Sequence, residues 1–299
     1  MSQKLSPSTV FLLIIPPAMW AGNAVVGRLV NDLVPPITLN FLRWAIAFLI
    51  IAPLGYSVFR KGSGLWTLRK RYLVLGLLGI GLFNTLMYIA LHTSTAINVT
   101  LVGASMPVWM LVIGAVFFGS RIAGTQVAGA VLSIAGVLTV LGQGQLAQLL
   151  ALRFVPGDIY MICAAIVWAL YSWLLVSSTD TPEIRSNWAT ILLAQLSFGV
   201  VWSGAFAMGE WALTDVHIQW GWPLAAAVAY VAVGPGIIAF RCWGLGVQRV
   251  GPTTAGFFNN LTPLFAALLS SAFLGDTPQL YHAVAFALIV GGIILSSRR

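Results

Sequence analysis

The chain has 299 residues and a formal net charge of +8, but only 7% of its residues are charged while 59% are hydrophobic. Soluble domains carry about 25% charged residues, so no soluble fold could hide this much apolar surface. Lipid must therefore be the solvent for most of the chain. The basic residues lie at the ends of apolar stretches and form no basic stripe, which excludes nucleic acid as a partner.

The apolar stretches have the length of membrane-spanning helices, which need about 20 mostly apolar residues. Breaks in the apolar pattern predict ten spans, at residues 9–30, 37–58, 72–93, 96–118, 124–142, 156–177, 187–208, 220–243, 253–274 and 280–297. The short connections between them leave no room for a soluble domain. The polar N-terminus is brief and the first stretch is long enough to remain as a span, so we expect no cleavable signal peptide.

Lys and Arg are distributed unequally between the two sides that the ten spans create. Of the 15 such residues, only Arg28, Arg43 and Arg153 fall on one side, and the other 12 (15 − 3) fall on the side that holds both termini. An excess of Lys and Arg marks the cytoplasmic side of a membrane protein. The sequence therefore predicts that both termini are cytoplasmic.

The second half of the chain resembles the first. A shift of 156 residues matches Pro107 with Pro263 and Gly136 with Gly292. A shift of 155 matches Gly79-Ile80-Gly81 with Gly234-Pro235-Gly236, and a shift of 148 matches Trp20-Ala21 with Trp168-Ala169. These matches predict two repeats, residues 1–148 and 149–299, with five spans each. An odd number of spans makes the second repeat enter from the opposite side, so the repeats should be inverted, as in transporters with alternating access.

Three motifs carry a family resemblance: Trp20-Ala21-Gly22-Asn23, Trp168-Ala169-Leu170-Tyr171, and the run Val250-Gly251-Pro252, Leu261-Thr262-Pro263 and Phe273-Leu274-Gly275-Asp276. With them the chain resembles the drug/metabolite transporter superfamily, and its EamA-type exporters in particular. Its size and aromatic-rich spans are most similar to the bacterial amino-acid exporters of the YddG type. The resemblance implies export of small metabolites across a bacterial cytoplasmic (inner) membrane. The first-half counterpart of the last motif, Phe117-Phe118-Gly119-Ser120-Arg121, lacks the acid.

Paired helix interruptions are the best pointer in sequence to a transport site. Pro107 and Pro263 predict matched kinks in spans 4 and 9, because proline removes a backbone hydrogen bond. The matched glycine triplets predict interruptions in spans 3 and 8. For a single glycine, close helix packing is the simpler interpretation.

Deep polar and aromatic side chains predict where the solute binds, since polar groups are costly inside a membrane. We expect a cavity between the halves, lined mainly by spans 1, 3, 4, 6, 8 and 9. The expected cavity residues are Trp20, Asn84, Tyr88, Trp109, Trp168, Tyr171, Trp243 and Asn259. The alternative for each is helix-to-helix hydrogen bonding or contact with lipid. Spans 5 and 10 show no deep polar group and should pack peripherally.

Charge inside the spans is scarce. Arg43 and Arg241 are expected to snorkel to the interface, with attraction of a substrate carboxylate as the alternative for Arg241. No Asp or Glu falls at mid-membrane, so an obvious group for ion coupling is missing. The open alternatives are uniport and coupling through His92 or His282. A cavity with aromatic walls and few charges suits amino acids with apolar side chains better than phosphates.

The alternatives to amino-acid export are export of drugs or other metabolites and an intramembrane serine hydrolase. Gly103-Ala104-Ser105 with His92 or His282 faintly resembles an intramembrane serine hydrolase, but no orienting acid is visible. A channel is disfavoured, since there is no ring of like charge or filter sequence. We expect no catalytic residue, no cofactor and no metal. The expected partners are the lipid bilayer and a small-molecule substrate, with the chain acting as a monomer.

Overall fold

A computed structural model describes residues 5–30, 32–94, 96–176, 180–215, 217–274 and 279–298. All regular secondary structure in these residues is helical. Among them, nine segments are long and apolar enough to cross a membrane: Pro7–Gly27, Pro36–Phe59, Arg69–Leu91, Asn98–Phe118, Gly124–Leu141, Pro156–Val176, Trp188–Leu213, Trp222–Leu269 and Leu280–Ser297. The prediction of an all-helical, multi-pass membrane fold is confirmed, and the count of ten spans stays a prediction.

The segment Trp222–Leu269 is 48 residues long, about twice what one span requires. It is interrupted at Gly251, whose φ of 83° and ψ of 160° are readily available only to glycine. The two arms on either side of Gly251 correspond to the predicted spans 8 and 9. Helix continues up to this glycine, so the expected end of span 8 at residue 243 was too early.

The helices follow one another in the predicted order. In the first half they are α1 (Pro7–Leu29), α2 (Pro36–Gly55), η1 (Tyr56–Phe59), α3 (Arg69–Gly76), η2 (Leu77–Leu82), α4 (Phe83–Thr93), α5 (Ala96–Gly103), α6 (Met106–Phe118), α7 (Gly124–Leu141) and α8 (Leu146–Leu150). In the second half they are α9 (Pro156–Val176), α10 (Pro182–Arg185), α11 (Trp188–Leu213), α12 (Trp222–Val231), η3 (Ala232–Ile238), α13 (Ala239–Phe258), η4 (Asn259–Leu261), α14 (Thr262–Leu274) and α15 (Leu280–Ser297).

The paired interruptions are confirmed. Span 4 breaks between α5 and α6, and the residues at a shift of 156 form the short 3₁₀ turn η4. Spans 3 and 8 contain π-helical turns, η2 and η3, that correspond at a shift of 155. Such single π turns are frequent at functional sites. The side chain of Asn40 donates to the carbonyl of Ile80 within η2, at 3.3 Å.

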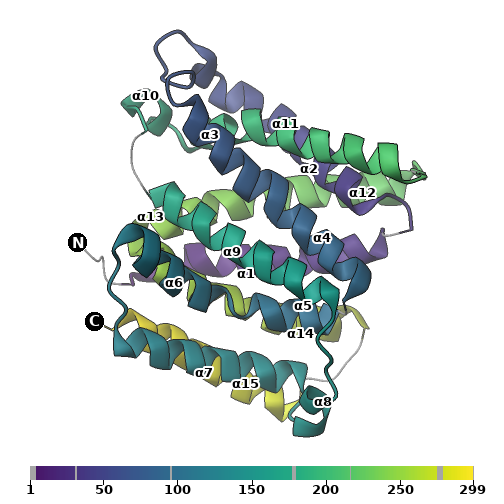
Figure 1. Ribbon diagram of the computed structural model, residues 1–299, viewed down its shortest axis with the longest axis vertical. Coiled ribbons are helices and arrows are strands. Elements are labelled where there is room, and N and C mark those ends of the chain that lie inside the picture. Colours follow the sequence, from purple (N-terminus) through teal and green to yellow (C-terminus); the bar gives the residue numbers. More distant parts are fainter. Residues whose placement is uncertain are drawn as a thin grey trace.

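Helices from the two halves pair with each other along the bundle. The main contacts join α7 with α15, α2 with α11, α4 with α9, and α1 with α13. Figure 1 shows α7 and α15 side by side at one edge, with α1 beginning and α15 ending at the same end of the bundle. The inverted relation between the halves stays a prediction.

The α7–α15 pair packs closely through glycine. A Cβ atom on Gly129 would lie 2.7 Å from the carbonyl oxygen of Gly292, and one on Gly292 would lie 2.6 Å from that of Gly129. The outer faces of both helices are exposed, but the expectation that span 5 lacks a deep polar group was wrong. Ser133 is fully buried and accepts a hydrogen bond from Asn260 Nδ2 at 2.9 Å, so it tethers α7 to the interruption in span 9.

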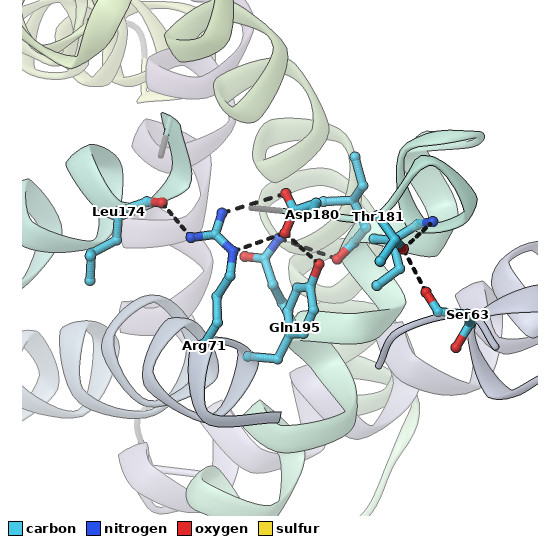
Figure 2. Close-up of polar contacts among 9 residues, drawn as sticks. Ser63, Arg71, Leu174, Asp180, Thr181 and Gln195 are labelled. Carbon is cyan, nitrogen blue, oxygen red and sulfur yellow. Dashed lines mark hydrogen bonds and ion pairs between the residues drawn. The ribbon is translucent and has the colours of Figure 1, made fainter. Parts of the chain in front are cut away.

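An ion pair joins the halves at the end where the termini lie. Arg71, at the start of α3, donates from Nε to Asp180 at 2.8 Å and from Nη1 to the carbonyl of Leu174 at 2.9 Å (Figure 2). The hydroxyl of Tyr72 also donates to Asp180, at 2.7 Å. At the other end, Glu210 accepts hydrogen bonds from the backbone of Ile37 and Thr38 and so caps α2.

Candidate solute-binding site

Four of the predicted site residues come together in one aromatic cluster. Trp168 on α9 is its centre: the ring centroids of Trp20, Tyr171 and Trp243 lie 5.2, 5.1 and 5.5 Å from that of Trp168. Two residues that the sequence did not single out complete the cluster, Phe83 at 4.7 Å and Phe240 at 5.6 Å from Trp168. These are the distances at which aromatic pairs attract each other. We call these six residues the aromatic cluster.

The polar tips of the cluster are only partly paired. Tyr171 donates to Gln195 Oε1 at 2.9 Å, and Trp243 Nε1 donates to Ser172 Oγ at 3.2 Å. The indole nitrogen of Trp168 is buried and has no hydrogen-bond partner among the described residues. Buried polar atoms are nearly always paired in proteins, so this N–H is an exception that calls for an explanation.

Asn84 and Tyr88 lie one turn apart on α4, as predicted. Their side chains are 4% and 6% exposed. Asn84 Nδ2 and the hydroxyl of Tyr88 are buried, and neither has a partner among the described residues. A deep, unpaired polar group in a membrane span is a candidate functional group.

Arg43 corrects the sequence analysis, which expected it to snorkel to the interface. It is 2% exposed, its Cζ lies 4.4 Å from the ring centroid of Trp44, and its Nη1 lies 3.5 Å from Asn23 Oδ1. Hydropathy could not show that the Arg43 face of α2 points into the bundle. Arg241 is exposed and lies over the ring of Trp188 at 4.3 Å, which fits the interfacial interpretation.

Trp109 and Asn259 lie at the interruptions of spans 4 and 9. Trp109 Nε1 donates to Ser105 Oγ at 3.1 Å, and Asn259 Nδ2 contacts the sulfur of Met106 at 3.3 Å. The two interruptions pack together, because a Cβ atom on Gly256 would lie 2.8 Å from Met110 Cγ. The cavity role of all eight predicted residues stays a prediction.

Ser105 makes local hydrogen bonds. Its hydroxyl donates to the carbonyl of Val102 at 2.5 Å and accepts from Trp109, so neither described bond involves a histidine. Nδ1 of His282 instead accepts from the backbone of Gln279. The side chain of His92 and the motif residues Gly275 and Asp276 lie outside the described residues. The geometry therefore offers no support for a serine nucleophile activated by His282.

A cavity of about 750 Å³ opens toward the end of the bundle opposite the ion pair. It is lined by residues of α2, α4 and α11, including Pro36, Thr85, Ile89 and Glu210, and by residues just outside α2 and α11, including His217. It differs from the cavity expected at the centre, where the aromatic rings pack against one another. Thr85, which lines this cavity, directly follows the buried Asn84 on α4.

Comparisons with known proteins give a consistent picture. The sequence model of the EamA-like transporter family matches the chain twice, at residues 7–142 and 155–298. The aromatic amino acid exporter YddG of Ancylobacter novellus is 27% identical over 88% of each chain. The uncharacterized transporter YyaM of Bacillus subtilis is 25% identical over 85% of this chain and 82% of that protein. A protein named "probable terminal-alkyne amino-acid exporter" in Streptantibioticus cattleyicolor is 27% identical over 66% of this chain and 62% of its own length.

A protein of known crystal structure has a similar fold. It superposes with a TM-score of 0.74 at 23% identity, and the alignment covers 96% of both chains. At this identity the likeness concerns the fold alone.

Proposed function

Because the chain belongs to the EamA-like transporter family, we propose that it exports amino acids, with aromatic or apolar side chains preferred. The observation that carries the substrate class is the aromatic cluster around Trp168, which gathers four helices at the centre of the bundle. Aromatic surfaces with a few polar tips are suited to organic solutes. The names of two relatives, an aromatic amino acid exporter and an amino-acid exporter, support the same class.

The mechanism is alternating access between two inverted repeats. The matched π turns and the matched breaks in spans 4 and 9 supply deformable points in both halves. The protein lies in the cytoplasmic (inner) membrane with both termini in the cytoplasm, so the end closed by Arg71 and Asp180 faces the cytoplasm. A solute then enters at that end and leaves through the end that carries the 750 Å³ cavity.

Transport by the purified protein tests this proposal. Proteoliposomes loaded with labelled phenylalanine should release it faster than protein-free liposomes, and unlabelled aromatic amino acids should compete better than glucose 6-phosphate. Replacing Trp168 with Phe should slow the flux several-fold, because it removes the unpaired N–H and part of the stacking surface. Trp66→Phe is the matched control, since Trp66 is 67% exposed. Transport of a phosphorylated solute with no amino-acid flux would contradict the substrate class.

A further inference from the structure

Arg43 is a buried cation that has no anionic partner among the described residues. In the part of the chain that the structure describes, the one ion pair joins Arg71 to Asp180, and Arg43 is 2% exposed. Its Nε has no hydrogen-bond partner among the described residues. A charge held away from water is expensive unless it is paired and hydrogen-bonded. The structure therefore contains a positive site that an anion would stabilise.

Polar groups of two neighbouring helices, α4 and α1, lie on the side of α2 that carries Arg43. Tyr88 packs against α1 one turn from Asn23, since a Cβ atom on Gly27 would lie 4.0 Å from Tyr88 Cε1, and its hydroxyl has no hydrogen-bond partner among the described residues. Asn84, one turn earlier on α4, presents an unpaired Nδ2. Asn23, from α1, contributes its Oδ1 at 3.5 Å from Nη1 and holds one side of the guanidinium. Among the described residues, three of the unpaired buried donors are Arg43 Nε, Asn84 Nδ2 and Tyr88 OH. An acceptor-only ligand such as a carboxylate matches these donors.

The site lies well inside the membrane. Arg43 is the eighth residue of α2, which begins at Pro36, so it is about 10 Å along the helix axis at 1.5 Å per residue. That is about a third of the hydrocarbon thickness of 30 Å. At this depth few waters compete for the guanidinium, which strengthens its attraction for an anion.

A chain of ring contacts connects Arg43 to the aromatic cluster. Arg43 lies over Trp44, whose ring centroid is 4.8 Å from that of Phe240, and Phe240 is 5.6 Å from Trp168. The cation is therefore linked to the aromatic cluster through two rings, those of Trp44 and Phe240. This combination matches a solute that carries a carboxylate at one end and an apolar or aromatic group at the other.

We propose that Arg43, assisted by the hydroxyl of Tyr88 and Nδ2 of Asn84, binds the carboxylate of the transported solute. This inference rests on the proposed function and assigns it a recognition group. A single guanidinium suits a monocarboxylate, since phosphate groups are usually held by several Arg or Lys side chains. The planar fork of the guanidinium can bind both carboxylate oxygens at once, which lysine cannot do.

Binding to the full-length protein in detergent tests the site without transport. The probes are 3-phenylpropionate and its uncharged amide, and isothermal titration calorimetry measures the affinity of the protein for each. We expect the wild type to bind the carboxylate at least tenfold more tightly than the amide. Arg43→Met and Tyr88→Phe should reduce this ratio, Arg43→Met to about one. Arg241→Met is the matched control, because Arg241 also lies over a tryptophan ring but is exposed. It should keep the wild-type ratio.

Equal binding of the two probes by the wild type would overturn the proposal. The proposal would also be overturned if both Arg43→Met and Tyr88→Phe kept the wild-type ratio of carboxylate to amide affinity. Tyr88→Phe keeps the test decisive if Arg43→Met does not fold. Arg43→Lys should keep only part of the preference, because it retains the charge and loses the fork.

Transport separates this proposal from the proposed function. If the wild type carries phenylalanine and phenylalaninamide equally and Arg43→Met does the same, the carboxylate site fails while export stands. If the wild type carries no amino acid but its carboxylate preference in binding depends on Arg43, the substrate assignment fails and the anion site stands.

Discussion

The close packing of α7 against α15 gives a stability prediction with an internal control. Alanine at Gly292 would place its Cβ 2.6 Å from the carbonyl oxygen of Gly129 and 2.9 Å from Ser133 Cβ. Neither atom can rotate away, since one belongs to the backbone and the other is fixed to it. The two helices must separate, and the contacts along their shared face weaken.

The magnitude follows from two opposing effects. Overpacking a close contact costs about 1–3 kcal/mol, whereas replacing glycine with alanine inside a helix stabilises it by about 0.5–1 kcal/mol. Gly292→Ala should therefore lower the free energy of unfolding on balance. Gly209→Ala should raise it, because Gly209 lies inside α11 and a Cβ there meets no atom within 4 Å. The two variants should differ by about 1–3 kcal/mol.

Thermal unfolding in detergent, followed by tryptophan fluorescence, measures the difference. One kcal/mol corresponds to about 2–4 °C in Tm for chains of 150–250 residues, so Gly292→Ala should melt several degrees below Gly209→Ala. Gly129→Ala should behave like Gly292→Ala, because a Cβ there approaches the partner carbonyl at 2.7 Å. A Gly292→Ala protein that melts at or above the control would refute the packing argument.

Three further predictions follow from other parts of the structure. Gly251→Ala should lower the free energy of unfolding by about 1–3 kcal/mol in the same melting assay, because the backbone φ of 83° at Gly251 is strained for a residue with a Cβ atom. Lys61→Cys in a Cys163→Ala, Cys242→Ala background should react with an impermeant maleimide only in inverted vesicles; labelling in intact cells contradicts the orientation. Leu175 is 5% exposed and lies near the Arg71–Asp180 ion pair. In a Leu175→Cys protein, Asp180→Asn should increase the rate of cysteine alkylation because it weakens this ion pair, whereas the control Arg69→Gln should leave the rate unchanged. An unchanged rate would mean that the ion pair does not hold this end closed.

Much of the fold could be predicted from the sequence because the membrane imposes simple rules. Spans must be apolar and helical, so hydropathy located them, and the repeat located the interruptions at Pro107 and Gly234. The gathering of Trp20, Trp168 and Trp243 followed from the same repeat. These features depend on patterns along the chain, which survive without knowledge of packing.

What sequence could not predict is which face of a helix points inward. Arg43 and Ser133 lie on spans with little amphipathic pattern, so their burial is set by neighbouring helices and not by local sequence. The same uncertainty affected Phe83 and Phe240, which read as ordinary apolar residues although they complete the aromatic cluster. The position of a buried charge therefore required the three-dimensional structure.

The two ends of the bundle are held by different polar contacts: an ion pair, Arg71 with Asp180, at one end, and hydrogen bonds from the start of α2 to Glu210 at the other. Asp180 and Asp32 correspond at a shift of 148, the shift that matches Trp168 with Trp20. Asp180 accepts from Arg71 and Tyr72, whereas Asp32 is bonded through its backbone carbonyl, by Gln219 Nε2 at 3.4 Å. A hydrogen bond to a charged group contributes about 1.5–3 kcal/mol, which corresponds to about 10- to 150-fold in a two-state population. In the proposed orientation this cost falls on opening toward the cytoplasm, where an exporter loads. A solute that binds the form open to the cytoplasm must therefore offset the free energy of breaking the Arg71–Asp180 ion pair. A carboxylate bound by Arg43 is an interaction strong enough to offset it.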